Sequence, residues 1–208
     1  MTTRPDVILI DAGVGNLRSV KKALQSLGAS VLQTADPEAL ASGEPLVLPG
    51  VGAFGDFMRG LQERRLAPAV LSAVRGGVPL LGICVGMQAL FECSLEMGRH
   101  PGLGLLPGRV LPFPAQPGLK IPHTGWNQLI PRKPEPLLRG IAAGDYAYFN
   151  HSYYCEPAGD ADAVAAETDY GLRFTSAIQQ GNLYAVQFHP EKSQKVGLQV
   201  LANFLSLS

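Results

Sequence analysis

Cys84 has the surroundings of a nucleophile. It lies in the run G-I-C-V-G at 82–86, between an apolar segment at 79–83 that predicts a buried strand and an apolar spacing at 87–95 that predicts a helix. A nucleophile on such a strand-to-helix turn has a strained backbone, and glycines on either side leave room for it. The N–H groups at a helix start favour a thiolate over a thiol. Considered alone, the cysteine also fits a buried structural role, which is commoner for free thiols.

His189 and Glu191 are the expected partners of this thiol. A cysteine nucleophile needs a base that moves its proton and a group that orients the base. The segment H-P-E at 189–191 follows an apolar strand, and side chains two apart in an extended segment point to the same side. We therefore expect Cys84, His189 and Glu191 to form a catalytic triad, and we interpret His100 as an ordinary core or surface histidine.

A glycine-rich turn offers donors for the negative oxygen that forms when a thiolate attacks a carbonyl. The run P-G-V-G at 49–52 follows the apolar segment 46–48. Gly50 and Gly52 flank Val51 there, so the backbone N–H groups of Val51 and Val85 are the expected donors of an oxyanion hole. The alternative interpretation is a tight turn between a strand and a helix.

The elements that must position these residues alternate along the first half of the chain. Apolar runs at 7–10, 30–33, 46–48 and 79–83 predict strands, and the spacing at 17–27 predicts a helix. Strands that are buried on both faces and alternate with helices predict a parallel sheet, with its chemistry at the carboxyl ends of the strands.

The second half has a different pattern. It predicts strands at 146–154, 163–167, 174–179 and 183–188, a hairpin turn at 180–182, mainly loops at 101–136 and a final helix at 196–207. We therefore expect one α/β domain over residues 1–208. Its central sheet is expected to be mainly parallel and flanked by helices, with an antiparallel extension in the C-terminal half.

Composition narrows the function classes. The 208 residues carry 17 basic and 17 acidic side chains, so the chain lacks the basic footprint of a protein that binds nucleic acid or a membrane surface. Three cysteines without metal-ligand spacing predict no zinc site and fit a reducing cytoplasm. The N-terminus predicts neither a signal peptide nor a membrane span. The run G-V-G-N at 13–16 lacks the full dinucleotide fingerprint, so we expect no cofactor.

Three motifs together resemble those of the triad-type, class I glutamine amidotransferases, and the resemblance covers essentially the whole chain. They are P-G-V-G at 49–52, G-I-C-V-G-M-Q at 82–88 and Q-F-H-P-E at 187–191. The resemblance implies a flavodoxin-like fold in which Cys84 attacks the side-chain amide of glutamine. His189 then protonates the leaving ammonia, and water hydrolyses a γ-glutamyl thioester. It also implies that Gly52 and Gln88 hold the substrate; Gln88, at i+4 from Cys84, would share its helix face.

The ammonia acceptor is suggested by less general segments. H-T-G-W-N at 123–127, N-H-S-Y-Y at 150–154 and H-P-E-K-S at 189–193 are similar to those of the glutaminase subunits of imidazole glycerol phosphate synthases. This implies a heterodimer with a (β/α)8-barrel cyclase subunit, which uses the ammonia to make imidazole glycerol phosphate and aminoimidazole carboxamide ribotide in histidine biosynthesis. It further implies that two residues approach the bound glutamine and four lie near the cyclase. The first two are Ser152 and Tyr153, and the four are Asn16, Trp126, Tyr148 and Lys192.

Other interpretations remain open at this point. The aromatic residues at the expected interface could instead belong to the core and Lys192 to the solvent, although unpaired Trp and Tyr are typical interface anchors. A stand-alone thiol hydrolase of peptides or γ-glutamyl compounds is a second function, against which Gln88 and the H-P-E triplet argue. An amidotransferase subunit of another pathway is a third. A binding protein without chemistry would not be expected to keep Cys84, His189 and Glu191.

Overall fold

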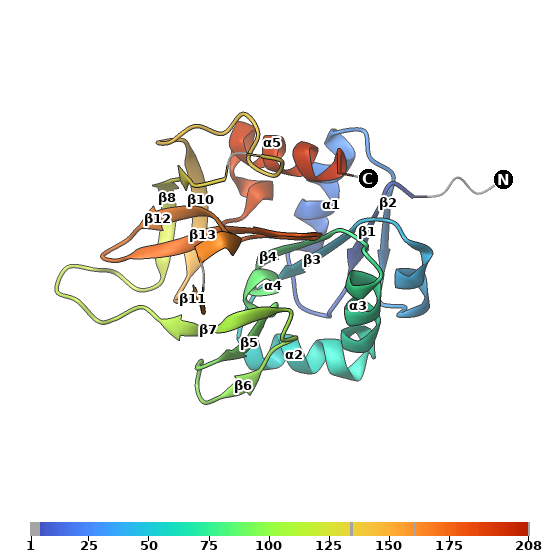
Figure 1. Ribbon diagram of the computed structural model, residues 1–208, viewed down its shortest axis with the longest axis horizontal. Helices are drawn as coiled ribbons and strands as arrows, with labels where there is room; N and C mark the ends of the chain where they lie inside the picture. The colour runs from blue at the N-terminus through green and yellow to red at the C-terminus, as the bar shows by residue number, and fades with distance from the viewer. Residues whose placement is uncertain (1–4, 134, 160, 208) are drawn as a thin grey trace.

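A parallel sheet forms the centre of the structure. Residues 5–133, 135–159 and 161–207 are described by a computed structural model (Figure 1). Five strands lie in the order β2-β1-β3-β4-β14, and each pair is parallel. These strands are β1 (Val7–Ile10), β2 (Val31–Thr34), β3 (Leu46–Gly50), β4 (Leu80–Cys84) and β14 (Leu183–Val186).

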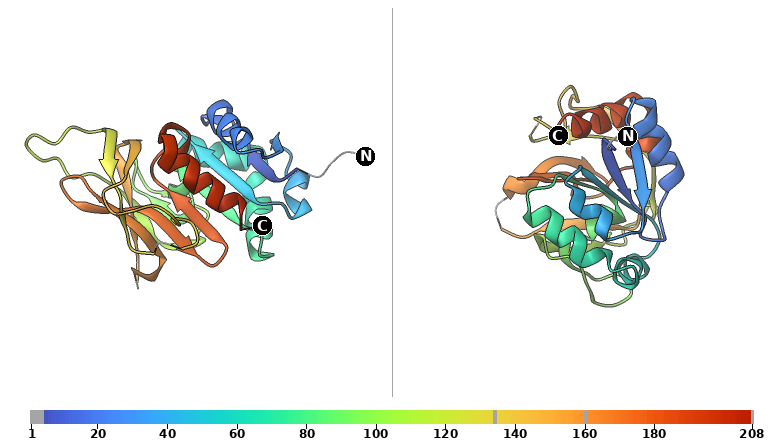
Figure 2. Two further views of the ribbon diagram at one scale, coloured as in Figure 1. Left: turned by 90° about the horizontal axis from the view of Figure 1, so that it is seen from above. Right: turned by 90° about the vertical axis from the view of Figure 1, so that its right-hand side faces the viewer.

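Helices cover both faces of this sheet, as two viewing directions show (Figures 1 and 2). One face carries α1 (Leu17–Ser26) and α5 (Gln194–Leu205), and the other carries α2 (Phe54–Glu63) and α3 (Leu66–Arg75). Every residue of β1, β3, β4 and β14 is buried as a result, which explains their uninterrupted apolar runs. The strand at the edge of the sheet, β2, is half-buried.

Beyond β14 the sheet continues through β13, β11, β7, β5 and β6, and β12 pairs with β13 and β9. All these contacts are antiparallel except that of β5 with β7. The predicted turn is confirmed, since Gln180 pairs with Leu183 across a two-residue hairpin. The predicted fold class is therefore confirmed. The bounds are β5 (Phe91–Ser94), β6 (His100–Pro101), β7 (Leu106–Pro112), β9 (Ile130–Pro131), β11 (Tyr153–Pro157), β12 (Val164–Asp169) and β13 (Arg173–Gln180).

A separate two-stranded sheet lies beside this extension. Its strands, β8 (His123–Gln128) and β10 (Tyr146–His151), are antiparallel. Side chains alternate across it: His123 and His151 are buried, whereas Trp126 and Tyr146 are exposed. Short 3-10 turns complete the structure, namely η1 (Glu38–Ser42), η2 (Ala161–Ala163) and η3 (Pro190–Lys192).

The helix predicted at 87–95 is wrong for most of its length. Helix α4 (Val85–Gln88) has only four residues, and the chain then enters β5. The carbonyl oxygens of Ala89 and Leu90 accept hydrogen bonds from backbone N–H groups within 103–106. The following segment thus occupies the acceptors that a longer helix would need, and a contact distant in sequence ends the helix.

Two further predictions need correction. The segment 101–136, expected to be mainly loops, contains β7, β8 and β9. The strand expected at 146–154 is divided at Ser152 into β10 and β11, which belong to different sheets. In the part of the chain that the structure describes, no helix has the length and apolarity to cross a bilayer.

Candidate active site

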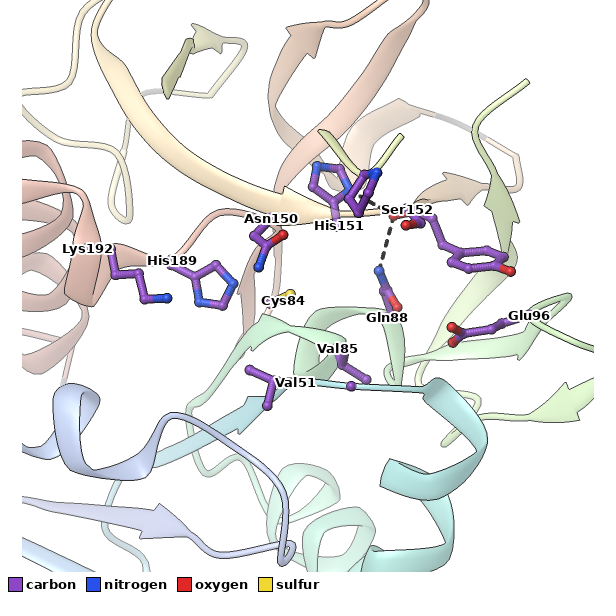
Figure 3. Close-up of a pocket in the computed structure, with 13 residues that line it drawn as sticks. Val51, Cys84, Val85, Gln88, Glu96, Asn150, His151, Ser152, His189 and Lys192 are labelled. Atoms are coloured by element: carbon purple, nitrogen blue, oxygen red, sulfur yellow. Dashed lines mark hydrogen bonds between the residues drawn. The ribbon is translucent and has the colours of Figure 1, made fainter. Parts of the chain in front are cut away.

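Cys84 ends β4 and begins α4, on a turn whose backbone angles are φ 54° and ψ −111°. Such a conformation is rare for a residue with a side chain. The flanking glycines are required by close backbone contacts: a Cβ at Gly82 would lie 2.8 Å from the carbonyl oxygen of Gly86, and a Cβ at Gly86 would overlap that of Leu48. The side chain of Cys84 points toward a cavity at the carboxyl ends of the parallel strands (Figure 3).

His189 follows β14, the parallel neighbour of β4, and its ring lies between Cys84 and Glu191. The Nδ1 atom is 3.0 Å from Glu191 Oε1, and both side chains are buried. The backbone around His189 is fixed: its N–H donates to the Tyr148 carbonyl, and its own carbonyl accepts from the Ser193 hydroxyl. The expected contact between His189 and Glu191 is present, but the segment is not extended. The 3-10 turn η3, which begins at Pro190, brings the two side chains together.

The surroundings favour a charged imidazole. Burial lowers the pKa of His189, but hydrogen bonds to Cys84 and Glu191 and the charges of these two groups raise it to about 10. Burial raises the pKa of Glu191, whereas the contact with His189 and a hydrogen bond from Asn16 outweigh this effect and lower it. The arrangement is therefore an imidazolium held between a sulfur and a carboxylate.

The P-G-V-G turn lies beside Cys84. Gly50 pairs with Cys84 across β3 and β4, and a Cβ on Gly50 would lie 2.9 Å from the Gly86 nitrogen. Gly52 has a φ of 85°, and a Cβ built on it would meet no atom within 4 Å. Packing therefore constrains the backbone of this turn less at Gly52 than at Gly50. Val51, Gly52 and Val85 all line the cavity.

A cavity of ≈ 250 Å³ unites most of the expected site residues. Gln88 donates hydrogen bonds from Nε2 to the Tyr153 carbonyl oxygen and to Gln187 Oε1, both at 3.2 Å. The size and the polar wall suit a small polar molecule. The lining residues are Val51, Gly52, Cys84, Val85, Gln88, Glu96, Pro122, Asn150, His151, Ser152, Tyr153, His189 and Lys192.

Sequence reasoning missed four of the polar groups, of which Asn150 lies on the cavity wall. Glu96 lines the cavity and also accepts a 2.6 Å hydrogen bond from the Phe54 N–H at the start of α2, which follows the P-G-V-G turn. His151 lies on the wall, and the Gln187 amide contacts the sulfur of Cys84 at 3.6 Å. Gln187 and His151 stand inside motifs of the sequence, which could have identified them, whereas nothing local singles out Glu96.

The four expected interface residues occupy two places. Trp126 and Tyr148 face each other across β8 and β10, with ring centroids 6.0 Å apart, and Lys192 Nζ lies 5.5 Å from the centre of the Tyr148 ring. Trp126 is 46% exposed, so it is not a core residue. Asn16 instead donates from Nδ2 to Glu191 Oε1 at 3.0 Å.

Within the described residues, no three His, Cys, Asp or Glu side chains are grouped as metal ligands would be. The buried His123–His151 pair is instead joined ring to ring, with Nδ1 of His123 3.0 Å from Nε2 of His151. Burial lowers the pKa of His123 to about 4 and that of His151 to about 3, so both rings are neutral near pH 7.

Comparisons with known proteins agree with this site. The sequence matches the family described as glutamine amidotransferase class-I over residues 8–207. The imidazole glycerol phosphate synthase subunit HisH of Gloeobacter violaceus is 49% identical over 206 residues, covering 99% of this chain and 91% of that protein. The HisH subunit of Moorella thermoacetica is 50% identical over 198 residues, covering 95% and 93%.

A crystal structure of a glutamine amidotransferase has the same fold, with a TM-score of 0.74, 24% identity, and coverage of 97% of this chain and 99% of that one. The resemblance inferred from the three motifs is confirmed by these matches. The chain therefore belongs to the class-I glutamine amidotransferases and, within them, to the HisH subunits of imidazole glycerol phosphate synthase.

Proposed function

We propose that Cys84, His189 and Glu191 hydrolyse glutamine to glutamate and ammonia. The Cys84 sulfur attacks the carboxamide carbon, the carbon–nitrogen bond breaks, and His189 gives its proton to the leaving nitrogen. His189 then takes a proton from water, whose oxygen attacks the γ-glutamyl thioester; the carbon–sulfur bond breaks, and the γ-carboxylic acid of glutamate is released and ionises, which restores the Cys84 thiolate beside a protonated His189. The observation that carries this proposal is the buried His189 ring, which joins Cys84 to Glu191 on the wall of the cavity.

The remaining roles follow from the cavity wall. The N–H groups of Val51 and Val85 would stabilise the tetrahedral oxygen, with Gly50 and Gly52 allowing the turn its shape. Gly52, Gln88, Ser152 and Tyr153 would hold the substrate. Glu96, the one acidic side chain among the described lining residues, would attract the ammonium group of glutamine. Figure 3 shows Gln88 between Cys84 and Glu96. A bound glutamine would place its carboxamide at Cys84 and its ammonium group at Glu96, with Gln88 beside it.

The ammonia would pass to a (β/α)8-barrel cyclase subunit in a heterodimer. There it would be used to make imidazole glycerol phosphate and aminoimidazole carboxamide ribotide in histidine biosynthesis, in the cytoplasm. Two observations support this partner. The relatives are named as subunits of that synthase. The exposed Trp126 packs against the half-buried Tyr148, and Lys192 joins this pair to the wall of the cavity, which places an apolar surface beside the source of ammonia. We propose that residues 1–208 act as one such domain.

Glutaminase activity tests this function. Glutamate release is measured with the chain alone, with a barrel cyclase, and with the cyclase plus its ribonucleotide substrate. Turnover is expected to rise with each addition. Equal turnover in all three would instead indicate a stand-alone hydrolase.

The Cys84→Ala variant separates the two half-reactions. It should abolish synthesis fed by glutamine and spare synthesis fed by free ammonia, because the cyclase chemistry does not need the thiol. Loss of both activities in a folded complex would contradict the division of labour.

A further inference from the structure

Gln187 is a fully buried glutamine in contact with the nucleophile. It follows β14, and its backbone N–H donates to the Ser176 carbonyl at 2.9 Å, so its main chain continues the sheet. Its side-chain Nε2 lies 3.6 Å from Cys84 Sγ, and its Oε1 accepts from Gln88 Nε2 at 3.2 Å. A buried amide must satisfy its polar atoms, and this one does so through the two residues that would bind and attack the substrate.

The direction of this amide is fixed by its neighbours. The Tyr153 carbonyl oxygen can only accept, so the Gln88 group that faces it at 3.2 Å must be the NH₂. The same NH₂ faces Gln187, which must therefore present its oxygen to Gln88. The NH₂ of Gln187 is then left to point at Cys84 Sγ. Rotating either amide by 180° would bring two donors or two acceptors together.

The sulfur is a strong partner for this N–H in one state only. A neutral thiol is a weak acceptor, whereas a thiolate accepts a charge-assisted hydrogen bond. The amide is thus poised to stabilise the ionised nucleophile, and it does so without adding a charge to a buried site.

We propose that Gln187 is a further catalytic residue of this chain, which donates a hydrogen bond to the Cys84 thiolate and holds Gln88 in register with it. The proposal rests on the function proposed above, because it concerns the same site. It assigns two effects to one side chain: the NH₂ acts on the nucleophile, and the oxygen acts on Gln88, which would hold the substrate.

Other titratable or charged groups also act on Cys84 and must be held constant. His189 contacts the sulfur, and Cys155 is close enough for the two thiols to influence each other. The charged or titratable groups on the cavity wall are Glu96, His151, Tyr153, His189 and Lys192. The substitutions below leave all of them in place.

The pH dependence of Cys84 alkylation by iodoacetamide is the first test. Peptide mass spectrometry separates Cys84 from Cys93 and Cys155. Gln187→Met keeps the approximate length of the side chain and adds no titratable group, but it removes the NH₂ that faces the sulfur. Alkylation of Cys84 at pH 7 should be roughly tenfold to a hundredfold slower, with its midpoint at higher pH, because a hydrogen bond to a charged group is lost.

Gln179→Met is the matched control. Gln179 is a half-buried glutamine of β13 whose amide bonds the backbone at Leu137 and Glu135, away from Cys84. Its variant should alkylate as the wild-type chain does. An unchanged alkylation profile in folded Gln187→Met would overturn the proposal.

Steady-state kinetics of the complex separates the two effects. Gln187→Glu keeps an oxygen for Gln88 but places a carboxyl where the NH₂ faces the sulfur, so it should lower kcat for glutamine hydrolysis with little change in KM. Gln187→Met removes both contacts and should also raise KM. Equal kcat and KM in both variants and the control would contradict the assigned roles.

A measurement on unsubstituted Gln187 covers the case in which these variants fail to fold. The ¹⁵N-labelled side-chain amide of Gln187 should change its chemical shift as Cys84 ionises, and this titration should vanish in Cys84→Ala. A shift that ignores the sulfur would refute the contact. Alkylation and amide shifts require neither glutamine nor a partner. If the proposed function is wrong, the wild-type complex will lack glutaminase activity. Cys84 alkylation and the amide shift of Gln187 would still test the contact between Gln187 and Cys84.

Discussion

Asn16 and His189 donate to the same oxygen of Glu191. Asn16 Nδ2 and His189 Nδ1 each lie 3.0 Å from Oε1, whereas the buried Oε2 has no hydrogen-bond partner among the described residues. The residue expected at the partner interface thus contacts the acid of the expected triad. Asn16 precedes α1, so a displacement of this helix start would change the orientation of Glu191.

Asn16→Ala is therefore expected to lower kcat for glutamine hydrolysis by about tenfold, because the carboxylate loses a charge-assisted hydrogen bond that orients it. The rate is measured in the complex at saturating glutamine. Gln25→Ala, an exposed substitution on the same helix, serves as the control. Equal rates for the two variants would show that His189 alone positions Glu191.

The alkaline limb of the pH–rate profile should report His189. Its pKa is raised to about 10, so the imidazolium persists through neutral pH and is lost as the pH rises through that value. Glu191→Gln removes a negative charge and should move the limb of kcat to lower pH by about one unit or more. The exposed substitution Glu156→Gln, remote from the site, should leave the limb unchanged. An unmoved limb in Glu191→Gln would mean that another group sets it.

The elements around Cys84 could be predicted because their causes are local. Continuous apolar runs identify β1, β3 and β4, and Gly82 is required by its contact with Gly86 in the turn itself, whereas Gly86 is required by a distant contact with Leu48 of β3. His189 and Glu191 could be paired from their spacing, although the turn η3, not an extended chain, joins them.

The features that escaped prediction depend on contacts distant in sequence. Helix α4 is short because segment 103–106 occupies the carbonyls that would continue it. Strand β7 was hidden in a segment rich in Pro and Gly, where Gly108, with a φ of 120°, packs against the backbone of β11. Glu96 reaches the cavity only because β5 returns the chain beside it, so its role has no local pattern.

The buried histidine pair predicts acid sensitivity. His123 and His151 have pKa values lowered to about 4 and about 3, so the unfolded chain binds more protons than the folded chain below pH 6.5. Their contribution to stability is complete above pH 6.5 and is lost as the pH falls toward 4. The free energy of unfolding, measured by urea denaturation, should decrease across this window.

His123→Phe isolates this effect. It removes one titration and keeps the aromatic stacking with Tyr170 and Phe149, so its pH slope should be shallower than that of the wild-type chain. Stability at pH 7 should be lower, since His151 Nε2 loses its donor. His100→Asn, outside the pair, should keep the wild-type slope. Equal slopes for His123→Phe and the wild type would assign the acid sensitivity to other groups.

Gly86→Ala is expected to destabilise the fold. Its Cβ would overlap the Leu48 carbonyl oxygen in β3, so β3 or the Cys84 turn must move, at a cost of about 1–3 kcal/mol or more. Urea denaturation measures the loss, and glutaminase activity should fall with it. Gly76→Ala is the control, because its Cβ would meet nothing closer than 3.3 Å. Equal stability of the two variants would show that the backbone around Cys84 adjusts freely.

Trp126 and Tyr148 should anchor the partner. They form an edge-to-face pair on the outer side of β8 and β10, in which Trp126 is exposed and Tyr148 half-buried, and Trp and Tyr are typical of the residues that dominate binding energy. Trp126→Ala should weaken affinity for the cyclase subunit about thirtyfold while leaving the thermal midpoint of the chain close to wild type, because the ring is 46% exposed. Titration calorimetry measures the affinity, and Met97→Ala, at a residue 88% exposed near Glu96, is the control. If both variants bind as the wild type does, the interface lies elsewhere. The contact of Lys192 with Tyr148 would then not connect the interface to the cavity.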